Sequence, residues 1–184
     1  MKKSFILIIF ITGILISCSS DKNSSEKQNL IKEITASEKK ISENNELIFK
    51  NPNAGTNLIA LYNNYATQYP DDSLSAIYTY KAAELCNALG KGQDAIKYYN
   101  QVLTKYPDFE KAPYCLFLIA FVYETQLNDI DKAREYYTEF INKYPDHEFA
   151  DDAKISIENL GMDLEELVKK FEENQNTDSL SANK

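Results

Sequence analysis

The chain has 184 residues, of which 43% are hydrophobic and 26% charged, with only five Gly and five Pro. This composition is typical of a globular protein and excludes a collagen-like, disulfide-dense or wholly disordered chain. The 20 Lys and Arg against 28 Asp and Glu give a net charge of −8. Such a balance argues against nucleic-acid binding, because phosphate affinity depends on clustered basic charge.

The N-terminus consists of two Lys residues followed by an apolar stretch from Phe5 to Ile16. The stretch is too short to cross a bilayer core of about 30 Å, but it has the usual length of the apolar region of a signal peptide. It ends in Leu15-Ile16-Ser17-Cys18, which resembles a bacterial lipobox, in which the thiol of the Cys accepts a diacylglyceryl lipid. We therefore predict a lipoprotein signal peptide at residues 1–17 and lipidation of Cys18. The alternative is an ordinary secretory signal with an incidental Cys.

The segment after the lipobox changes from polar to amphipathic. Residues 18–29 are rich in Ser and nearly free of apolar side chains, which predicts a flexible tether from the lipidated Cys. The next segment, residues 30–52, is predicted to contain an amphipathic helix. Its apolar side chains at helical spacing are Leu30, Ile31, Ile34 and Ile41.

The body of the chain repeats itself. Tyr-Pro-Asp occurs at residues 69–71, 106–108 and 144–146, so that successive prolines are 37 and 38 residues apart. Upstream of the later two copies, Ala95–Asp108 and Ala133–Asp146 are identical at seven of fourteen positions. A period in this range indicates an array of helical repeats.

Each copy predicts a helix that ends at its Tyr-Pro-Asp, because Pro disfavours helical geometry in the residue before it. Asp108 and Asp146 are placed to cap the helix that follows. Turns at residues 90–92 and 128–129 join the helices into antiparallel pairs. The remaining helices expected from apolar periodicity span residues 73–89, 110–126 and 148–160.

This pattern resembles the tetratricopeptide repeat, in which small residues, aromatic residues and a closing Pro recur at fixed places of a helix pair. The first full copy supplies Ala82-Ala83, Leu89-Gly90, Ala95, Tyr99 and Pro107, and the second supplies Ile119-Ala120, Tyr123, Ala133, Tyr137 and Pro145. The resemblance implies an all-α fold, a right-handed α-solenoid of tetratricopeptide-type helix pairs. The residues expected to pack neighbouring helices are Ala83, Ala95, Tyr99, Pro107, Ala120, Ala133, Tyr137 and Pro145.

The C-terminal part is expected to close the array. Residues 164–171 predict a short helix capped by Asp163, whose acidic start and basic end suit the helix dipole. Solenoids need such a C-terminal capping helix. The repeat domain is therefore expected to span residues 53–174, and residues 175–184 are expected to form a disordered tail.

The resemblance also implies a peptide-binding groove, because the first helices of tetratricopeptide arrays line a concave face. The residues that the alignment places there are Tyr80, Glu84, Asn87, Tyr114, Phe117, Phe121 and Glu124. Aromatic rings beside carboxylates suit a peptide or helix of partly basic character. The Lys/Asn clamp with which some family members hold C-terminal carboxylates is absent. The alternative is that this face packs on the terminal helix.

Two other groups of residues have both functional and structural interpretations. Asp146, His147, Asp151 and Asp152 form an acid-rich group. The helix dipole accounts for this group better than a metal does, so no metal is expected. Cys86 and Cys115 would form a disulfide in an oxidising envelope or, more commonly, remain buried free thiols. No catalytic motif is present, so the chain is expected to be neither an enzyme nor a cofactor-binding protein.

These observations predict a lipid-anchored, palmitate-bearing protein-interaction adaptor in the bacterial cell envelope. The repeats are similar to those of two groups of periplasmic proteins, the lipoprotein of the β-barrel outer-membrane assembly machine and the Tol–Pal-associated cell-division coordinator. That similarity implies a role in outer-membrane protein assembly or envelope organisation, at the outer membrane facing the periplasm or at the cell surface. A protein or peptide partner is expected and nucleic acid is not, and the oligomeric state stays open. The alternative is a solute- or glycan-capture lipoprotein that uses the groove aromatics.

Overall fold

The computed structural model of the chain describes residues 18–44, 46–170 and 172. Within these ranges the structure is helical and contains no strand, as predicted. Its helices are α1 (Cys18–Glu43), α2 (Leu47–Lys50), α3 (Pro52–Gln68), α4 (Ser73–Ala88), α5 (Gly92–Lys105), α6 (Ala112–Thr125), α7 (Ile130–Lys143) and α8 (Ala150–Asn159). Residues 164–170 are also helical. The predicted signal peptide (1–17) and the predicted tail (175–184) lie outside the described residues.

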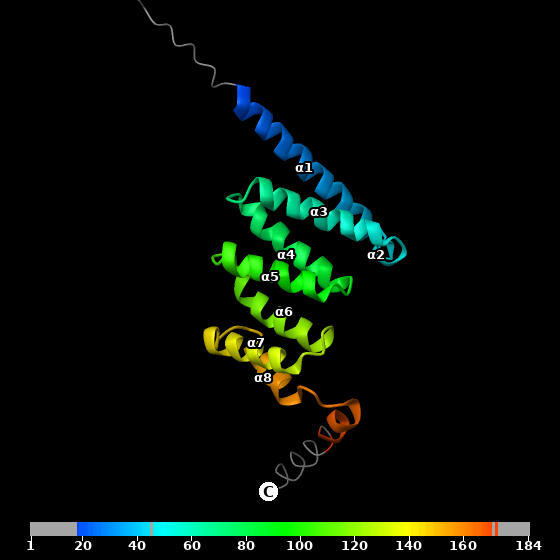
Figure 1. Cartoon of the computed structure of the whole chain (residues 1–184), viewed down its shortest axis with the longest axis vertical. Coiled ribbons are helices and arrows are strands. Elements are labelled where there is room, and N and C mark those ends of the chain that lie inside the picture. The colour runs from blue at the N-terminus through cyan, green and yellow to red at the C-terminus, as the bar shows by residue number, and fades with distance from the viewer. Residues whose placement is uncertain (1–17, 45, 171, 173–184) are drawn as a thin grey trace, which may run out of the picture.

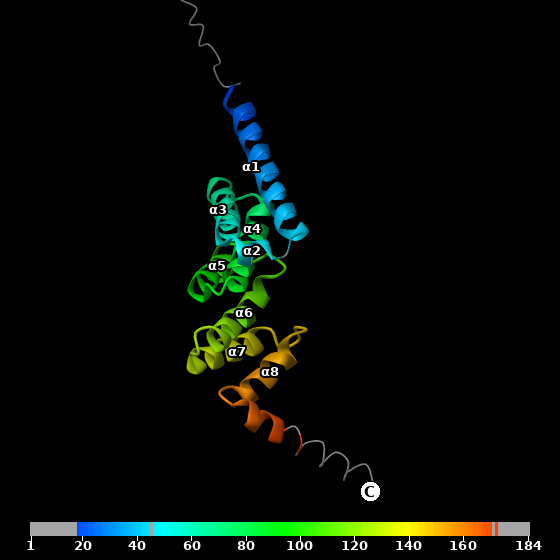
Figure 2. The same cartoon turned by 90° about the vertical axis from the view of Figure 1, so that its right-hand side faces the viewer.

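The helices stack in chain order. From α3 to α8, each helix packs against the next one along the chain, while α1 packs against α3. Figure 1 shows the resulting elongated stack. In the perpendicular view, α3, α5 and α7 lie along one side, and α1, α4, α6 and α8 lie along the other (Figure 2). This arrangement confirms the α-solenoid of helix pairs.

The three Tyr-Pro-Asp copies end α3, α5 and α7. Tyr69, Tyr106 and Tyr144 are the C-terminal caps, and each donates its backbone N–H to the carbonyl four residues earlier. The predicted caps of the following helices are wrong, because Asp108 and Asp146 do not cap α6 and α8. Two successive backbone turns follow each of Tyr106 and Tyr144 and carry the helix start to Ala112 and Ala150.

The tight turns within the pairs lie where the sequence predicts them. Gly90, with φ of +68°, follows the end of α4, and Asn128, with φ of +50°, follows α6. Both residues adopt the left-handed conformation that commonly ends a helix. Asp129 then caps α7, since its side chain accepts the backbone N–H of Lys132 at 3.1 Å.

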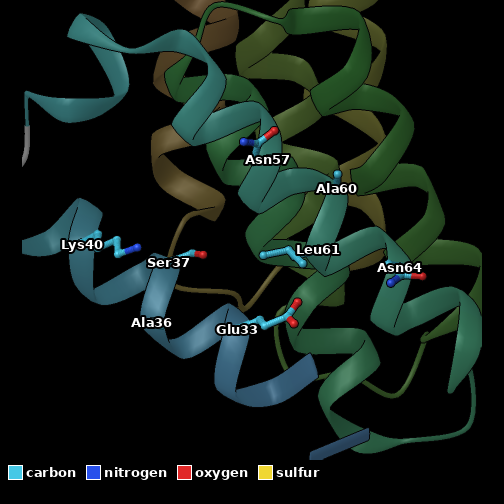
Figure 3. Close-up of a pocket in the computed structure, with 8 residues that line it drawn as sticks. All are labelled: Glu33, Ala36, Ser37, Lys40, Asn57, Ala60, Leu61 and Asn64. Carbon is cyan, nitrogen blue, oxygen red and sulfur yellow. The ribbon is translucent and has the colours of Figure 1, made fainter. Parts of the chain in front are cut away.

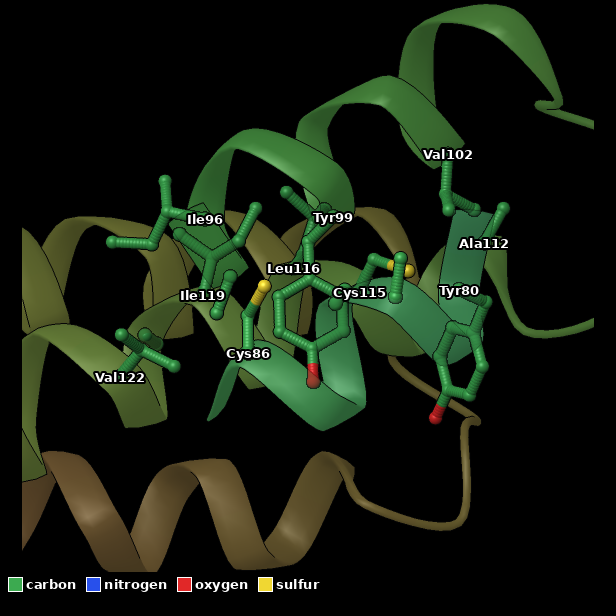
Figure 4. Close-up of a cluster of buried hydrophobic side chains, with 14 of the residues drawn as sticks. Tyr80, Cys86, Ile96, Tyr99, Val102, Ala112, Cys115, Leu116, Ile119 and Val122 are labelled. Atoms are coloured by element: carbon green, nitrogen blue, oxygen red, sulfur yellow. The ribbon is translucent and has the colours of Figure 1, made fainter. Parts of the chain in front are cut away.

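Small side chains and Tyr rings fill the seam between helix pairs. The residues of this seam that are no more than 4% exposed are Tyr62, Ala83, Ala95, Tyr99, Ala120, Ala133 and Tyr137. Figure 4 shows Tyr99 among side chains from α4, α5 and α6. Pro107 and Pro145, in contrast, are exposed at the corners. The prolines therefore act by ending helices, whereas the Ala and Tyr residues hold the helices together.

The segment expected to be a flexible tether is helical. The structure differs from the prediction for residues 18–29, because α1 already begins at Cys18. The segment contains neither Gly nor Pro, and Lys27 forms an ion pair with Asp72 and lies 5.7 Å from the centre of the Tyr69 ring. Leu30 and Ile34, from the predicted amphipathic helix, are buried on the core. Tertiary contacts thus stabilise a helix that local composition does not favour.

The C-terminal helix forms at residues 164–170, where the sequence places it. Asp163 and Glu166 form a reciprocal cap, in which each side chain accepts the backbone N–H of the other residue. Lys170 ties the helix to α8 through the Asn159 side chain at 2.8 Å. Leu164 and Val168 are nevertheless 78% and 48% exposed. The helix is therefore tied to α8 at its C-terminal end but does not cover the array with its apolar side chains.

Ala133 provides a direct test of the seam. Its side chain is fully buried on α7, so Ala133→Glu would bury an unpaired carboxylate. We expect a loss of several kcal/mol in the free energy of unfolding and a lower Tm, measured by circular dichroism. Glu135→Ala, on the exposed face of the same helix, is the control and should change stability by less than about 0.5 kcal/mol. An unchanged Tm for Ala133→Glu would contradict the packing register.

The contact between α1 and the repeats is expected to depend on pH through Asp72. The Lys27 ammonium, together with the Leu74 N–H and the Tyr65 hydroxyl, lowers the pKa of Asp72. A lowered pKa in the folded state stabilises the fold above the unfolded pKa of about 3.9, and this contribution is lost as pH falls through the folded value.

Urea unfolding of Asp72→Asn at several pH values tests this dependence. The variant should be less stable than the wild type at pH 7, and the difference should shrink below about pH 4. Asp71→Asn, at the exposed neighbouring carboxylate, is the matched control. A stability difference between Asp72→Asn and the wild type that stays constant down to pH 2 would contradict the ion pair.

Candidate functional site

The seven residues predicted to line one groove have different environments in the structure. Tyr80 is only 4% exposed and belongs to the core. Its ring lies 5.9 Å from that of Phe109 and 6.1 Å from that of Tyr99, and the Lys111 Nζ is 5.1 Å from its centre. Burial, followed by the charge of Glu84, raises the pKa of Tyr80. Tyr80 therefore joins α4 to its neighbours instead of facing a ligand.

Tyr114 and Phe117 belong to an aromatic cluster on α6. The Tyr114 ring stacks on Phe149 at a centroid distance of 4.3 Å and on Phe117 at 5.4 Å. His147 lies nearly parallel to Tyr114, at 6.2 Å, and Phe117 also contacts the Tyr137 ring. The cluster packs α6 against the α7–α8 connection. The α7–α8 connection therefore covers Tyr114 and Phe117, where the alternative interpretation expected the terminal helix.

Asn87 and Glu124 form hydrogen bonds within the protein. The Gln126 side-chain amide donates to both the backbone and side-chain oxygens of Asn87, which links the ends of α4 and α6. The Tyr137 hydroxyl donates to Glu124 Oε2 at 2.8 Å. Of the seven predicted residues, only Glu84 and Phe121 are exposed, Phe121 by 40%.

A groove does exist beside Glu84, between α1 and α4. This α1–α4 groove has a volume of about 610 Å³. The residues that line it are Thr35, Glu38, Lys39, Ile41, Ser42, Leu58, Tyr62, Lys81, Glu84, Leu85 and Ala88. Sequence reasoning missed all of them except Glu84, because α1 was predicted as a separate helical segment and not as a wall of the array. The signal available was the apolar spacing of Leu30, Ile34 and Ile41, which marks a helix with a face to bury.

Glu38 is the fixed polar centre of the α1–α4 groove. Its Oε1 atom accepts hydrogen bonds from the Tyr62 hydroxyl and from the Lys81 ammonium, both at 2.7 Å. Burial, followed by the hydrogen bond to Glu38, raises the pKa of Tyr62, so the hydroxyl remains a donor well above neutral pH. Three elements, α1, α3 and α4, are thereby joined at one carboxylate.

The three seam tyrosines differ in their hydroxyl partners. Tyr62 donates to Glu38 and Tyr137 donates to Glu124. The Tyr99 hydroxyl is buried and has no hydrogen-bond partner in the part of the chain that the structure describes. Figure 4 shows the hydroxyls of Tyr99 and Tyr80 pointing to the same side of the stack. The middle repeat thus retains the ring of the seam tyrosine without a carboxylate to fix its hydroxyl.

A second hollow lies between α1 and α3 (Figure 3). It has a volume of about 670 Å³ and is lined by short or polar side chains: Glu33, Ala36, Ser37, Lys40, Asn57, Ala60, Leu61 and Asn64. Leu61 is its one large apolar side chain. The hollow therefore offers less apolar surface for a partner to bury than the α1–α4 groove does.

The acid-rich group and the cysteines have structural roles. His147 Nδ1 accepts the backbone N–H of Phe149 at 3.3 Å, and its ring packs on Phe140 and Tyr114. Across residues 18–44, 46–170 and 172, no group of three or more His, Cys, Asp or Glu side chains is placed to hold a metal ion. Cys86 and Cys115 are buried free thiols, so the disulfide alternative is wrong. Burial raises the pKa of Cys86 to about 11 and that of Cys115 to about 12, so neither is a ready nucleophile.

Helix pairs stacked in chain order define the class of this protein as a helical-repeat scaffold. Residues 79–108 and 114–147 match the model of the tetratricopeptide repeat family, and these segments cover most of α4 with α5, and α6 with α7. No curated protein matches the chain. The match and the fold together support a tetratricopeptide-repeat protein. Such repeats are typically non-enzymatic scaffolds and commonly bind protein partners.

No helix in the described ranges is both long and apolar enough to cross a membrane.

Glu38→Ala tests the polar centre of the α1–α4 groove. The variant leaves the buried Tyr62 hydroxyl without its acceptor, which costs about 1–3 kcal/mol in the free energy of unfolding. Adding Tyr62→Phe removes the unpaired hydroxyl, so the double variant should lose less than the sum of the single losses in urea unfolding. Glu26→Ala, at an exposed carboxylate of α1 that lines neither the groove nor the second hollow, is the control. Additive losses would show that Glu38 and Tyr62 do not interact.

Proposed function

We propose that this protein is a lipid-anchored protein-interaction adaptor of the bacterial cell envelope. The observation that carries the proposal is the apolar α1–α4 groove on a stack of tetratricopeptide-type helix pairs. Leu58 and Tyr62 form the buried part of the groove, and Ile41 and Leu85 are half-buried at its sides. An apolar groove fixed between two helices suits a peptide segment from another protein.

The lipobox-like sequence supports an anchor at Cys18. The backbone of α1 starts at this residue and continues for 26 residues, a length of about 39 Å. The first part of α1 extends beyond α3 in Figure 1. A lipid on Cys18 would therefore hold the repeats away from the bilayer on a helical stalk. The net charge of −8 would also cause an anionic membrane surface to repel the protein.

The repeats and the anchor together favour a role in outer-membrane protein assembly or envelope organisation, at the outer membrane and facing the periplasm. The solute-capture alternative needs open aromatic faces for a sugar to stack on. Tyr80 is buried and Tyr114 and Phe117 stack on other rings, which leaves only Phe121 exposed among the predicted groove aromatics. The α1–α4 groove, with half-buried Ile41 and Leu85 at its sides, suits capture of a protein segment better.

Photo-crosslinking in intact cells tests the adaptor function. A photoreactive amino acid at Ala88, which is exposed and lines the α1–α4 groove, should give discrete crosslinked protein adducts. The same amino acid at Asn142, exposed on α7 outside the groove, should not give them. Full-length wild type should fractionate with membranes and incorporate labelled palmitate, and Cys18→Ser should do neither.

The two parts of this experiment fail separately. Adducts that form equally from Ala88 and Asn142, or from neither, would contradict binding in the groove. Membrane association and palmitate labelling that survive Cys18→Ser would contradict the anchor.

A further inference from the structure

We infer that the α1–α4 groove binds a peptide segment with apolar side chains and a Lys or Arg that pairs with Glu84. This inference rests on the proposed adaptor function and specifies the chemistry of the partner. The steps that lead to it are the distribution of charge in the groove, the shape of its apolar part and the position of Glu84 at its edge.

The charges of the groove are unevenly matched. Glu38 is neutralised by Lys81, whose Nζ lies 2.7 Å from Oε1. The other lysine of the groove, Lys39, lies 3.7 Å from Glu43 one turn further along α1. Among the described residues no Lys or Arg forms an ion pair with Glu84, which is exposed at the groove edge. The groove therefore has one carboxylate without a cation.

The negative charge of Glu84 acts on buried groups on both sides of α4. After the larger effect of burial, it contributes to the raised pKa of Tyr62 beside α1 and to those of Tyr80, Tyr99 and Tyr114 beside α5 and α6. No neighbouring ammonium or guanidinium offsets this charge by pairing with it. A cation supplied by a partner would meet a carboxylate whose charge is uncompensated and next to a low-dielectric core.

The apolar part of the groove supplies the second half of the specificity. Leu58 and Tyr62 lie at its base, and Ile41, Leu85 and Ala88 lie along its sides. A volume of about 610 Å³ accommodates several side chains. Burying apolar side chains there provides affinity, and the Glu84 pair fixes which segment fits and in which register. A wholly acidic or wholly polar segment would leave either the charge or the apolar surface unmatched.

A random peptide library displayed on phage tests the inference with the purified full-length protein. Peptides selected on the wild type should combine apolar residues with Lys or Arg. Peptides selected on Glu84→Lys should carry Asp or Glu in place of the basic residue. Glu135→Lys places the same charge change on an exposed Glu of α7, outside the groove, and should select the same peptides as the wild type. Circular dichroism would show that all three proteins have the same helix content and Tm.

Binding of the best wild-type peptide, measured by fluorescence anisotropy, makes the test quantitative. Replacing its basic residue with Gln should weaken binding about tenfold, which corresponds to a charge-assisted hydrogen bond. The same replacement in the peptide should not change its affinity for the Glu84→Gln variant.

Selected peptides without Lys or Arg, or a preference unchanged by Glu84→Lys, would overturn the inference. The absence of any selected peptide would overturn it as well. In either case adducts from Ala88 in cells would show that the adaptor function stands with a partner of different chemistry, whereas their absence would remove both proposals.

Discussion

The packing of three tyrosines against small residues is the constraint on which the rest of the structure depends. Tyr62, Tyr99 and Tyr137 are almost fully buried at the seams, and alanines such as Ala95 and Ala133 let the neighbouring helix backbones approach. A helix pair of this kind cannot bury its apolar face alone, so each pair needs the next one. The helices therefore stack in chain order. At each end of the described array, the last helix has a face that no further pair covers.

The dependence of the helix pairs on nearby residues explains how much of the fold could be predicted from the sequence. Tyr-Pro-Asp ends each second helix by backbone chemistry, and Gly90 and Asn128 mark turns, so the helix pairs follow from nearby residues alone. The starts of α6 and α8 lie two residues later than predicted, because a second backbone turn, ending at Ala112 and at Ala150, follows each Tyr-Pro-Asp turn. Residues 18–29 are helical and contact Asp72, far along the chain, through Lys27, and local composition cannot reveal such a contact.

The candidate site was harder to predict than the fold for the same reason. Family alignment placed Tyr80, Tyr114 and Phe117 on a binding face, but the rings of Phe109 and Phe149 cover them from loops that the alignment treats as connections. The groove lies one helix nearer the N-terminus, where α1 takes the place of a first helix without having its sequence pattern. Only Glu84 belongs to both the predicted face and the observed groove.

The position of α1 connects the proposed anchor at Cys18 to the groove. Its N-terminal half is held by the ion pair between Lys27 and Asp72, and its C-terminal half is held by Glu38. Both attachments are polar, and they add to the burial of Leu30 and Ile34 on the core. A partner cation at Glu84 would lie beside the Lys81–Glu38 pair, and occupation of the groove would be sensed by the same helix that begins at Cys18. Glu84, the charge proposed to select a partner, and the Lys81–Glu38 pair that holds α1 therefore lie in one groove.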